Sequence, residues 1–313
     1  MTAADWSDLM PRWEDVALVR ARLDAGADPN NDLYQPPLHA AAESGSPEVV
    51  AELAGRVDDI DAEWEGRSAL WLAVFNDCPD NVRALVAAGA DPWRPMMAGW
   101  SPGRLSLAGP TPGLFFPFPP GHARLTEAET AAVVEADRLI GVLSDTPSEG
   151  FSLACVRGIS AAEAARRLAA EPVGAEELEE IMFDPTDDEA QPILGFTDVP
   201  GGCVVSQEYS YLASTPGVMK ALSAGTVAYG MFANAKSGDQ TSVYRDGEVV
   251  AWDFHAGGIG APADSAEEVL LNYLYDGLTY AYCHAAAGLR PTGNVAITNP
   301  DTYLRLPEHD YWS

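Results

Sequence analysis

The sequence predicts a protein that is α+β overall, in which an α-helical solenoid of about three repeats plus a closing helix precedes a mixed α+β domain with a mainly antiparallel sheet. A five-residue signature recurs about every 33 residues near the start of the chain. A stretch rich in proline and glycine follows, and strand-like runs then alternate with helical ones. At 313 residues the chain exceeds one usual domain of about 100 to 200 residues, so two domains are expected.

The repeated signature can be followed at two positions in each unit. Gly-Ala-Asp-Pro-Asn at 26–30 returns in degraded form at 57–61 and as Gly-Ala-Asp-Pro-Trp at 89–93. Between these copies, Pro-Leu-His-Ala-Ala at 37–41 returns 32 residues later as Ala-Leu-Trp-Leu-Ala at 69–73. A fixed period of this length indicates a stacked helical array, in which each unit buries its apolar face against its neighbours.

These motifs resemble the ankyrin repeat, whose consensus contains a Thr-Pro-Leu-His turn and a Gly-Ala-Asp-hydrophobic-Asn ending. The resemblance covers about residues 4–95 and implies a solenoid that binds partners. Pro36 replaces the Thr that bonds to the following His, and Trp71 replaces that His in the third unit. Asp77 stands where a helix-ending Gly is usual, so local hydrogen bonding in the third unit is expected to be weaker. We assign residues 1–95 to the repeats.

Residues 96–148 are expected to form a connector and the closing helix. Six prolines and several glycines fill the first part of this segment, and proline at that density propagates neither a helix nor a central strand. The Trp-Ser-Pro at 100–102 resembles the stub of a fourth repeat. Thr126 then stands as an N-cap, with Glu129 at the capping-box position, for a helix over 127–143. We expect this helix to close the repeat stack.

Residues 149–313 are expected to form the mixed α+β domain, because helical patterns are mixed there with runs that favour antiparallel strands. Strands are predicted at 152–156, 202–206, 226–233 and 242–254, and helices at 160–168, 216–222 and 266–287. Asp246-Gly247 is the strongest hairpin signal in the chain, since this dipeptide tolerates the positive φ angles of a two-residue turn.

The second half of the chain also resembles an uncharacterised actinobacterial domain family that is found next to ankyrin-like repeats. The motifs that carry this resemblance are Cys-Val-Arg-Gly-Ile-Ser at 155–160, Ala-Ala-Arg-Arg-Leu at 164–168, Gly-Gly at 201–202, Glu208, Leu-Ala-Ser-Thr-Pro at 212–216 and Tyr-Arg-Asp-Gly-Glu at 244–248. The resemblance implies no established activity.

The charge balance is the next clue to function. Forty-seven acidic residues against 18 basic ones give a formal net charge of -29, and no Lys or Arg occurs from 169 to 218. Such a field repels nucleic acid and accelerates association with a cationic partner by about 10 to 1,000 fold. The alternative, that the acidic surface only maintains solubility, stays open.

No metal or cofactor is expected. The acidic run at 184–189 lacks the Gly at the sixth position and the Glu at the twelfth that a helix-loop-helix calcium loop requires, so a partly disordered acidic loop is favoured. The four cysteines lie far apart without metal-ligand spacing and are expected to be free thiols in a reducing compartment. The Gly-Gly-Ile-Gly at 257–260 has neither the spacing nor the Lys of a phosphate loop.

The partner-binding residues are predicted from repeat geometry. In an ankyrin-like stack, the loop tips and the outward positions of each first helix form a concave wall. Aromatic side chains mixed with carboxylates on such a wall favour a cationic protein surface. The residues at these places are Asp32, Tyr34, Glu43, Glu63, Trp64, Glu65, Phe75 and Asn76. Trp64 or Phe75 could instead pack inward on the connector.

Two hypotheses of different class follow. The favoured one is an intracellular, cytoplasmic protein-binding module that recognises or neutralises a basic protein; an immunity protein against a nuclease-type toxin, or a defence sensor, would have this charge pattern. Neither a secretion signal nor an apolar run long enough to span a bilayer is present, so no membrane partner is expected. The alternative is an enzyme whose active site is formed around Asp253, His255 and Glu208, with the repeats selecting the substrate. The oligomeric state stays unknown.

Overall fold

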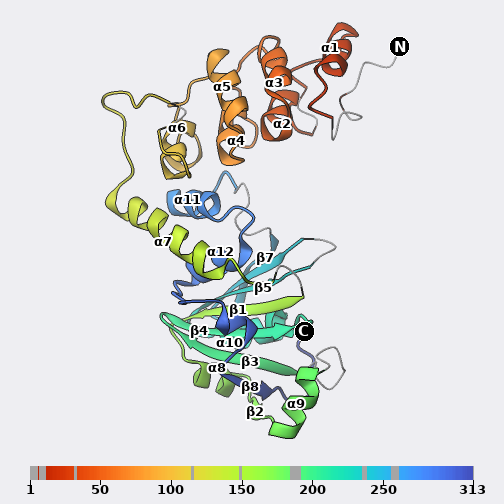
Figure 1. The fold of residues 1–313 in the computed structure, drawn as a ribbon, viewed down its shortest axis with the longest axis vertical. Helices are drawn as coiled ribbons and strands as arrows, with labels where there is room; N and C mark the ends of the chain where they lie inside the picture. The colour runs from red at the N-terminus through yellow and green to blue at the C-terminus, as the bar shows by residue number, and fades with distance from the viewer. Residues whose placement is uncertain are drawn as a thin grey trace. The chain divides into compact units, whose positions relative to one another are not determined.

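A computed structural model describes residues 6, 12–31, 34–113, 116–147, 150–183, 192–234, 238–254 and 261–312. Its contacts divide the chain into two units (Figure 1). The repeat unit comprises Met1–Ala131 and Ile259–Leu274, and the sheet unit comprises Ala132–Gly258 and Tyr275–Ser313. The domain boundaries expected after residues 95 and 148 stay predictions.

The repeat unit is built from short helices that pack in pairs. Its described helices are α1 (Val16–Asp24), α2 (Pro37–Ser44), α3 (Pro47–Ala54), α4 (Ala69–Phe75), α5 (Pro79–Ala87), η2 (Met97–Gly99), α6 (Pro102–Leu105), η3 (Ser106–Ala108) and α11 (Ala266–Leu274), with the first turn of α7 (Glu127–Leu143). Helix α2 packs against α3 and α4, and α5 packs against α3 and α4. This arrangement is the stack of helix pairs that the repeat period predicts.

Local sequence explains where these helices begin. Proline stands at the start of α2, α3 and α5, where its missing N–H loses no intrahelical hydrogen bond. Ser46 caps α3 by accepting a hydrogen bond from Val49 N at 3.4 Å, and Ser68 caps α4 by accepting one from Trp71 N at 3.2 Å. The repeated motif therefore carries its own helix-start signals.

The five-residue signature links each unit to the next. Asn30, the last residue of the first copy, accepts a hydrogen bond from Asp58 N at 2.9 Å through its side-chain oxygen. Asp61 ends the degraded second copy and accepts one from Asp91 N at 3.0 Å. The second copy thus keeps a side-chain oxygen at its fifth position that accepts a hydrogen bond from the next repeat, although most of its other residues differ from the consensus.

The third repeat differs from the second at the positions where its sequence departs from the consensus. His39 in the second repeat places Nε2 3.0 Å from Arg67 O, whereas its counterpart Trp71 is fully buried and its Nε1 has no hydrogen-bond partner among the described residues. Buried Asn81 compensates by donating from Nδ2 to three backbone carbonyls at the end of α2, at 3.0 to 3.3 Å. Asp77 adopts a φ of 48°, the left-handed conformation that favours glycine.

The Trp-Ser-Pro at 100–102, which the sequence indicates as the stub of a fourth repeat, leads into the single turn of α6. Ser101 caps the single turn of α6 by accepting from Arg104 N at 3.2 Å. The predicted capping box at the start of α7 is confirmed, because Thr126 N donates to Glu129 Oε2 at 2.7 Å and Glu129 N donates to Thr126 Oγ1 at 3.2 Å. Arg104 Nη2 donates to both carboxylate oxygens of Glu129, at 2.7 and 2.8 Å, and forms an ion pair with it. The closing role of α7 stays a prediction.

The sheet unit contains one eight-stranded sheet in the order β2-β8-β3-β4-β1-β5-β6-β7. Every described pairing in it is antiparallel. The strands are β1 (Phe151–Arg157), β2 (Glu171–Pro172), β3 (Ile193–Val199), β4 (Gly202–Glu208), β5 (Val227–Phe232), β6 (Gln240–Arg245), β7 (Glu248–Phe254) and β8 (Thr302–Arg305). The Asp246-Gly247 hairpin is confirmed, with φ angles of 52° and 81° between β6 and β7.

Helices cover both faces of the sheet. The described helices of this unit, besides the rest of α7, are α8 (Ala161–Arg167), α9 (Ala175–Phe183), η4 (Leu212–Ser214), α10 (Pro216–Leu222), α12 (Thr279–Ala287) and α13 (Val295–Thr298). One face packs Phe196 and Val205 against α8, α10 and η4. The alternate residues of the strands face α12 and α13, where Ser206 Oγ donates to Ala296 O at 3.1 Å.

One predicted element is corrected. The single helix expected over 266–287 is two helices, α11 and α12, which belong to different units. Residues 275–278 lie between them, and Gly277 has a φ of 66°, a left-handed conformation that a continuous right-handed helix does not adopt. Across the described residues, no helix has both the length and the apolar character that a membrane crossing requires.

Candidate functional site

Three of the predicted partner-binding residues lie at the hairpin tip of the third repeat. Trp64 N donates to Arg67 O at 2.9 Å, and Arg67 N donates to Trp64 O at 3.1 Å. Glu65 and Gly66 between them have φ angles of 51° and 76°, as a tight two-residue turn requires. The turn leaves Glu63 and Glu65 exposed and the Trp64 ring half-buried.

A buried cation lies behind this tip. The Arg67 side chain is 5% exposed, and its Nη2 lies 2.5 Å from Glu65 Oε2. Its Cζ lies 6.0 Å from the centroid of the Trp64 ring. Burial raises the pKa of Glu43, while a hydrogen bond from Gln35 and the charge of Arg67 oppose that rise. Two of the predicted carboxylates, Glu43 and Glu65, therefore already face a positive charge within the chain.

Glu63 of this tip and two other predicted residues, Tyr34 and Asn76, lie at the surface. Tyr34 is 84% exposed. Glu63 forms an ion pair with Arg94 at 3.2 Å, in which both side chains stay accessible to solvent. Asn76 is exposed, and its Nδ2 donates to a carbonyl one turn earlier in α4 at 2.9 Å. Asp32 lies outside the described residues.

Phe75 packs inward, which corrects its placement on the outward face. Its side chain is 4% exposed, and its ring lies 5.5 Å from the ring of Tyr273 in α11. Of the two placements that the sequence left open, burial applies, although the covering residue comes from α11 and not from the connector. Phe75 is therefore part of an internal contact.

Residues 261–274, here called the α11 segment, cover this part of the concave wall. Trp100 is fully buried and donates from Nε1 to Ala266 O at 2.9 Å. Pro262 lies so close to Gly66 that a Cβ on this glycine would be 3.6 Å from it. Burial lowers the pKa of Arg67, and the negative charges of Glu65, Glu43 and Asp264 oppose that shift.

Sequence reasoning missed the role of Trp100, although a signal was present. Trp100 stands 33 residues after Arg67, which itself stands 32 residues after Gln35, so the three occupy the same place just before a first helix. A tryptophan at this place, on the predicted concave wall, indicates a buried contact. Its partner could not be inferred, because Ala266 is 166 residues away in the chain.

The structure describes the side chain of only one of the three residues of the enzyme alternative, so it does not test whether they meet. Glu208 ends β4 opposite Phe151 and is exposed. Asp253 lies in β7, but its side chain is not described, and His255 lies outside the described residues. This alternative stays a prediction.

The cysteines are free thiols, and three of them are buried. Burial raises the pKa of Cys203 to about 12 and also raises the pKa of Cys155 and of Cys283. These thiols are therefore poor nucleophiles at neutral pH. In the parts of the chain that the structure describes, no three His, Cys, Asp or Glu side chains gather as a metal site would require, and the acidic run at 184–189 lies outside those parts.

Comparison with protein families agrees with both resemblances. Residues 12–96 match a model of ankyrin repeats in three copies, and residues 142–270 match a family of unknown function (DUF6461). No curated protein matches the chain. Ankyrin repeats are protein-binding modules, so the first part of the chain indicates a protein partner. The chain thus combines three ankyrin repeats with a domain of that family of unknown function.

Proposed function

We propose that the protein binds a basic partner protein through the rim of its repeats. The rim is the part of the predicted wall that the α11 segment leaves accessible, and its members are Tyr34, Glu43, Glu63, Trp64, Glu65 and Asn76. The observation that carries the proposal is the 84% exposure of Tyr34, a large aromatic side chain on a repeat loop. A few residues carry most of the binding energy in protein interfaces, and tyrosine is enriched among them.

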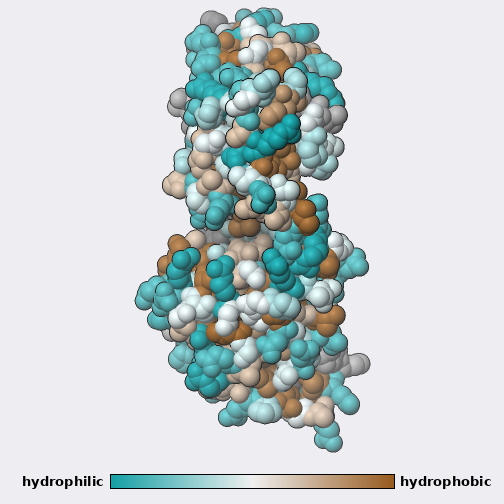
Figure 2. Space-filling model, turned by 90° about the vertical axis from the view of Figure 1, so that its left-hand side faces the viewer, coloured by the Kyte–Doolittle hydropathy of each residue, from teal (hydrophilic) through white to brown (hydrophobic). Residues whose placement is uncertain are grey.

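Charge supports a cationic partner. Carboxylates predominate in the loops of the second and third repeats, and the whole chain has a formal net charge of -29. Figure 2 shows hydrophilic residues mixed with hydrophobic ones over one face of the molecule. A surface rich in carboxylates attracts a basic protein over a long range, and it binds that protein more weakly as the salt concentration rises. An immunity protein that neutralises a nuclease toxin, or a defence sensor, would use this pattern.

The test begins with capture of partners from the native host by the full chain at low and at high salt. The purified partner is then titrated by calorimetry against the wild type and against Tyr34→Ala. We expect Tyr34→Ala to weaken binding about tenfold or more. We also expect Glu63→Gln with Glu65→Gln to reduce the salt dependence of Kd, because fewer charges then contribute.

The matched control is Glu48→Gln, on the second helix of its repeat, away from the rim. This variant removes one exposed carboxylate and is expected to change Kd by less than about twofold. The proposal would be contradicted by a partner that binds Tyr34→Ala as tightly as the wild type, or by a Kd that does not change with salt concentration.

A further inference from the structure

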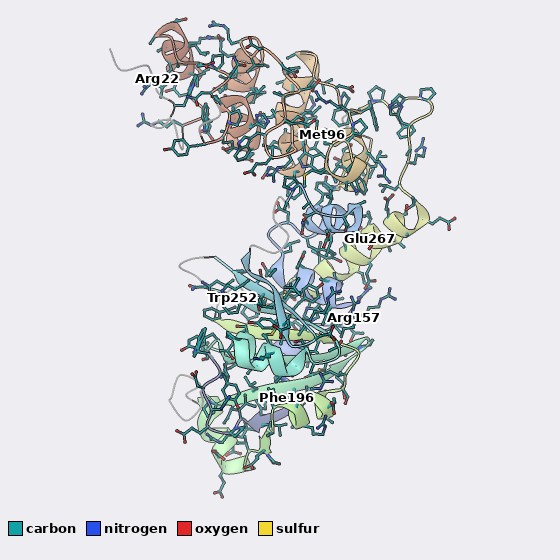
Figure 3. All side chains as sticks on the ribbon, turned by 180° about the vertical axis from the view of Figure 1, so that it is seen from behind. Arg22, Met96, Arg157, Phe196, Trp252 and Glu267 are labelled. Atoms are coloured by element: carbon teal, nitrogen blue, oxygen red, sulfur yellow. The ribbon has the colours of Figure 1, made fainter. Side chains whose placement is uncertain are left out.

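The sheet unit contains an aromatic pocket that neither the sequence motifs nor the family matches assign. Its volume is about 270 Å³, and it lies where η4, the strands β5 to β7 and the last described residues of the chain meet. Four rings line it, contributed by Tyr211, Phe232, Trp252 and Trp312. Figure 3 labels Trp252 on β7.

Strand register brings three of the lining residues to one face. Phe232 of β5 is paired with Gln240 of β6, and Ser242, two residues further along β6, is paired with Trp252 of β7. Residues two apart on a strand point to the same side of the sheet. The register therefore places Phe232, Ser242 and Trp252 beside one another on the face that also carries η4.

The last segment of the chain completes the pocket. Trp312 N donates to Asp310 Oδ1 at 2.9 Å, which turns the backbone so that Trp312 meets Tyr211. The rings of Tyr211 and Trp312 lie 5.1 Å apart at 55°, and those of Tyr211 and Phe232 lie 6.1 Å apart at 81°. Rings at such steep angles form separate walls instead of one stacked layer.

The electrostatics of the pocket favour a positive charge. The face of each ring carries the negative part of its quadrupole. Among the described residues that line the pocket, none is positively charged, and the chain as a whole is strongly acidic. Ser242 is buried, and its hydroxyl has no hydrogen-bond partner among the described residues, so a polar group is available at the wall. An anionic ligand would find no counter-charge in this lining.

We propose that this pocket binds an organic cation, a quaternary ammonium or a guanidinium group, between the rings of Tyr211, Trp252 and Trp312. These three side chains are each about half exposed, so a ligand can reach them from solvent. The cation is held over ring faces, and its alkyl or planar body fills the apolar space. The site is separate from the rim of the repeats, and each can fail without the other.

The test uses two cations and their uncharged isosteres with the full chain, by calorimetry and ligand-observed NMR. Choline is compared with 3,3-dimethylbutan-1-ol, and the peptide acetyl-Gly-Arg-Gly-amide with its citrulline counterpart. We expect at least one cation to bind about tenfold more tightly than its neutral isostere, as cation–π contacts with several rings provide. Preference for choline identifies a free ammonium compound as the source, and preference for the Arg peptide identifies a protein side chain.

Variants separate cation recognition from plain apolar burial. Trp312→Leu keeps apolar bulk but removes one ring, and it is expected to weaken cation binding about fivefold, whereas Trp312→Phe retains most of it. Trp252→Leu provides a second, independent ring deletion. Tyr209→Leu removes an exposed ring outside the pocket and should leave binding unchanged. Equal affinity for cations and isosteres, no binding of either cation at millimolar concentration, or full binding by both ring deletions would overturn the proposal.

Discussion

The contacts that stabilise the repeat unit and those that stabilise the sheet unit differ in how far apart their residues lie in the sequence. In the repeat unit, the links between neighbours join residues about one repeat apart, such as Asn30 with Asp58 and Asp61 with Asp91. In the sheet unit, β3 pairs with β8 from Ile193 to Arg305, more than a hundred residues along the chain. A contact that recurs at a fixed period leaves a pattern in the sequence, whereas a single long-range pairing leaves none.

The α11 segment is the exception that sharpens this comparison. It lies between β7 and α12 in the chain, and its residues up to 270 fall within the match to the family of unknown function, yet its contacts place it in the repeat unit. Its anchors, Trp100 and Phe75, come from repeat positions. The wall of the third repeat is thus covered by the chain itself, while Tyr34 on the second repeat stays exposed.

The largest effect is expected from Gly202→Ala in the sheet unit. A Cβ at this position would collide with Val156 O and would lie 2.9 Å from Gly158 N, and neither backbone atom can move without breaking the β1–β4 pairing. We expect the free energy of unfolding to fall by about 3 kcal/mol or more, measured by urea denaturation. Hydrogen exchange should show the loss in the strands and unchanged protection in α2 to α5.

Gly141→Ala in α7 is the matched control, because nothing lies within 4 Å of a Cβ there. Alanine in a helix interior is favoured over glycine, so this variant should gain about 0.5 to 1 kcal/mol. If Gly202→Ala were as stable as Gly141→Ala, the described register of β1 and β4 would be incorrect.

Asn81→Ala tests the repeat unit in the same way. Its buried amide donates to Ala41 O, Ala42 O and Gly45 O, and removing it leaves these carbonyls without that donor. We expect a loss of about 2 to 3 kcal/mol, seen as faster hydrogen exchange across α2 to α5. Asn76→Ala, which removes an exposed amide with one hydrogen bond, should cost about 1 kcal/mol or less. Equal effects of the two variants would contradict the bridging role of Asn81.

Acid should weaken the sheet unit through His284. Complete burial lowers the pKa of this imidazole from 6.5 to about 4, although its Nδ1 lies 2.8 Å from Tyr280 O. Because the folded pKa is below the unfolded one, the unfolded chain binds more protons between pH 6.5 and 4, and stability is lost as the pH falls through that window. We expect a loss of about 2 kcal/mol between pH 7.5 and pH 5, measured by urea unfolding.

The repeat unit has a corresponding group, since burial also lowers the pKa of His39. His284→Gln should reduce the pH dependence of the sheet unit and leave that of the repeat unit intact, with hydrogen exchange reporting on each unit. An unchanged pH profile in the strands of this variant would show that another group titrates there.

The smallest effect is expected from Trp100→Phe. Phenylalanine keeps a ring in the wall position but cannot donate to Ala266 O, so the α11 segment loses one partly buried hydrogen bond. We expect a cost of about 1 kcal/mol and faster hydrogen exchange within 266–274. If the hydrogen-exchange rate of α11 did not change in this variant and equalled that of α12, α11 would not belong to the repeat unit.

The sequence predicted those features that depend on near neighbours in the chain. The repeat period, the capping box at Thr126 and the Asp246-Gly247 turn are all confirmed, since each is decided within a few residues or by recurrence. The helix predicted over 266–287 was wrong at residues 275–278, because its apolar pattern continued through Gly277, whose left-handed backbone does not fit a continuous helix.

For the candidate site, the pattern located the hairpin tip of the third repeat but not its internal partners. The exposure of Tyr34, Glu63 and Glu65 agrees with the predicted wall, whereas the burial of Phe75 depends on Tyr273, almost two hundred residues later. Whether an aromatic residue on a repeat faces solvent depends on what else in the chain can cover it, and spacing carries no information about that.

Residue order alone was enough to establish a helical array, a following α+β domain and an acidic protein, because local backbone preference, periodicity and charge are properties of short segments. Only the folded chain decided that β8 joins β3, that α11 covers the third repeat and that four rings from distant segments meet in one pocket. These pairings are selected by the joint fit of many surfaces and backbone groups, and no single segment encodes that fit.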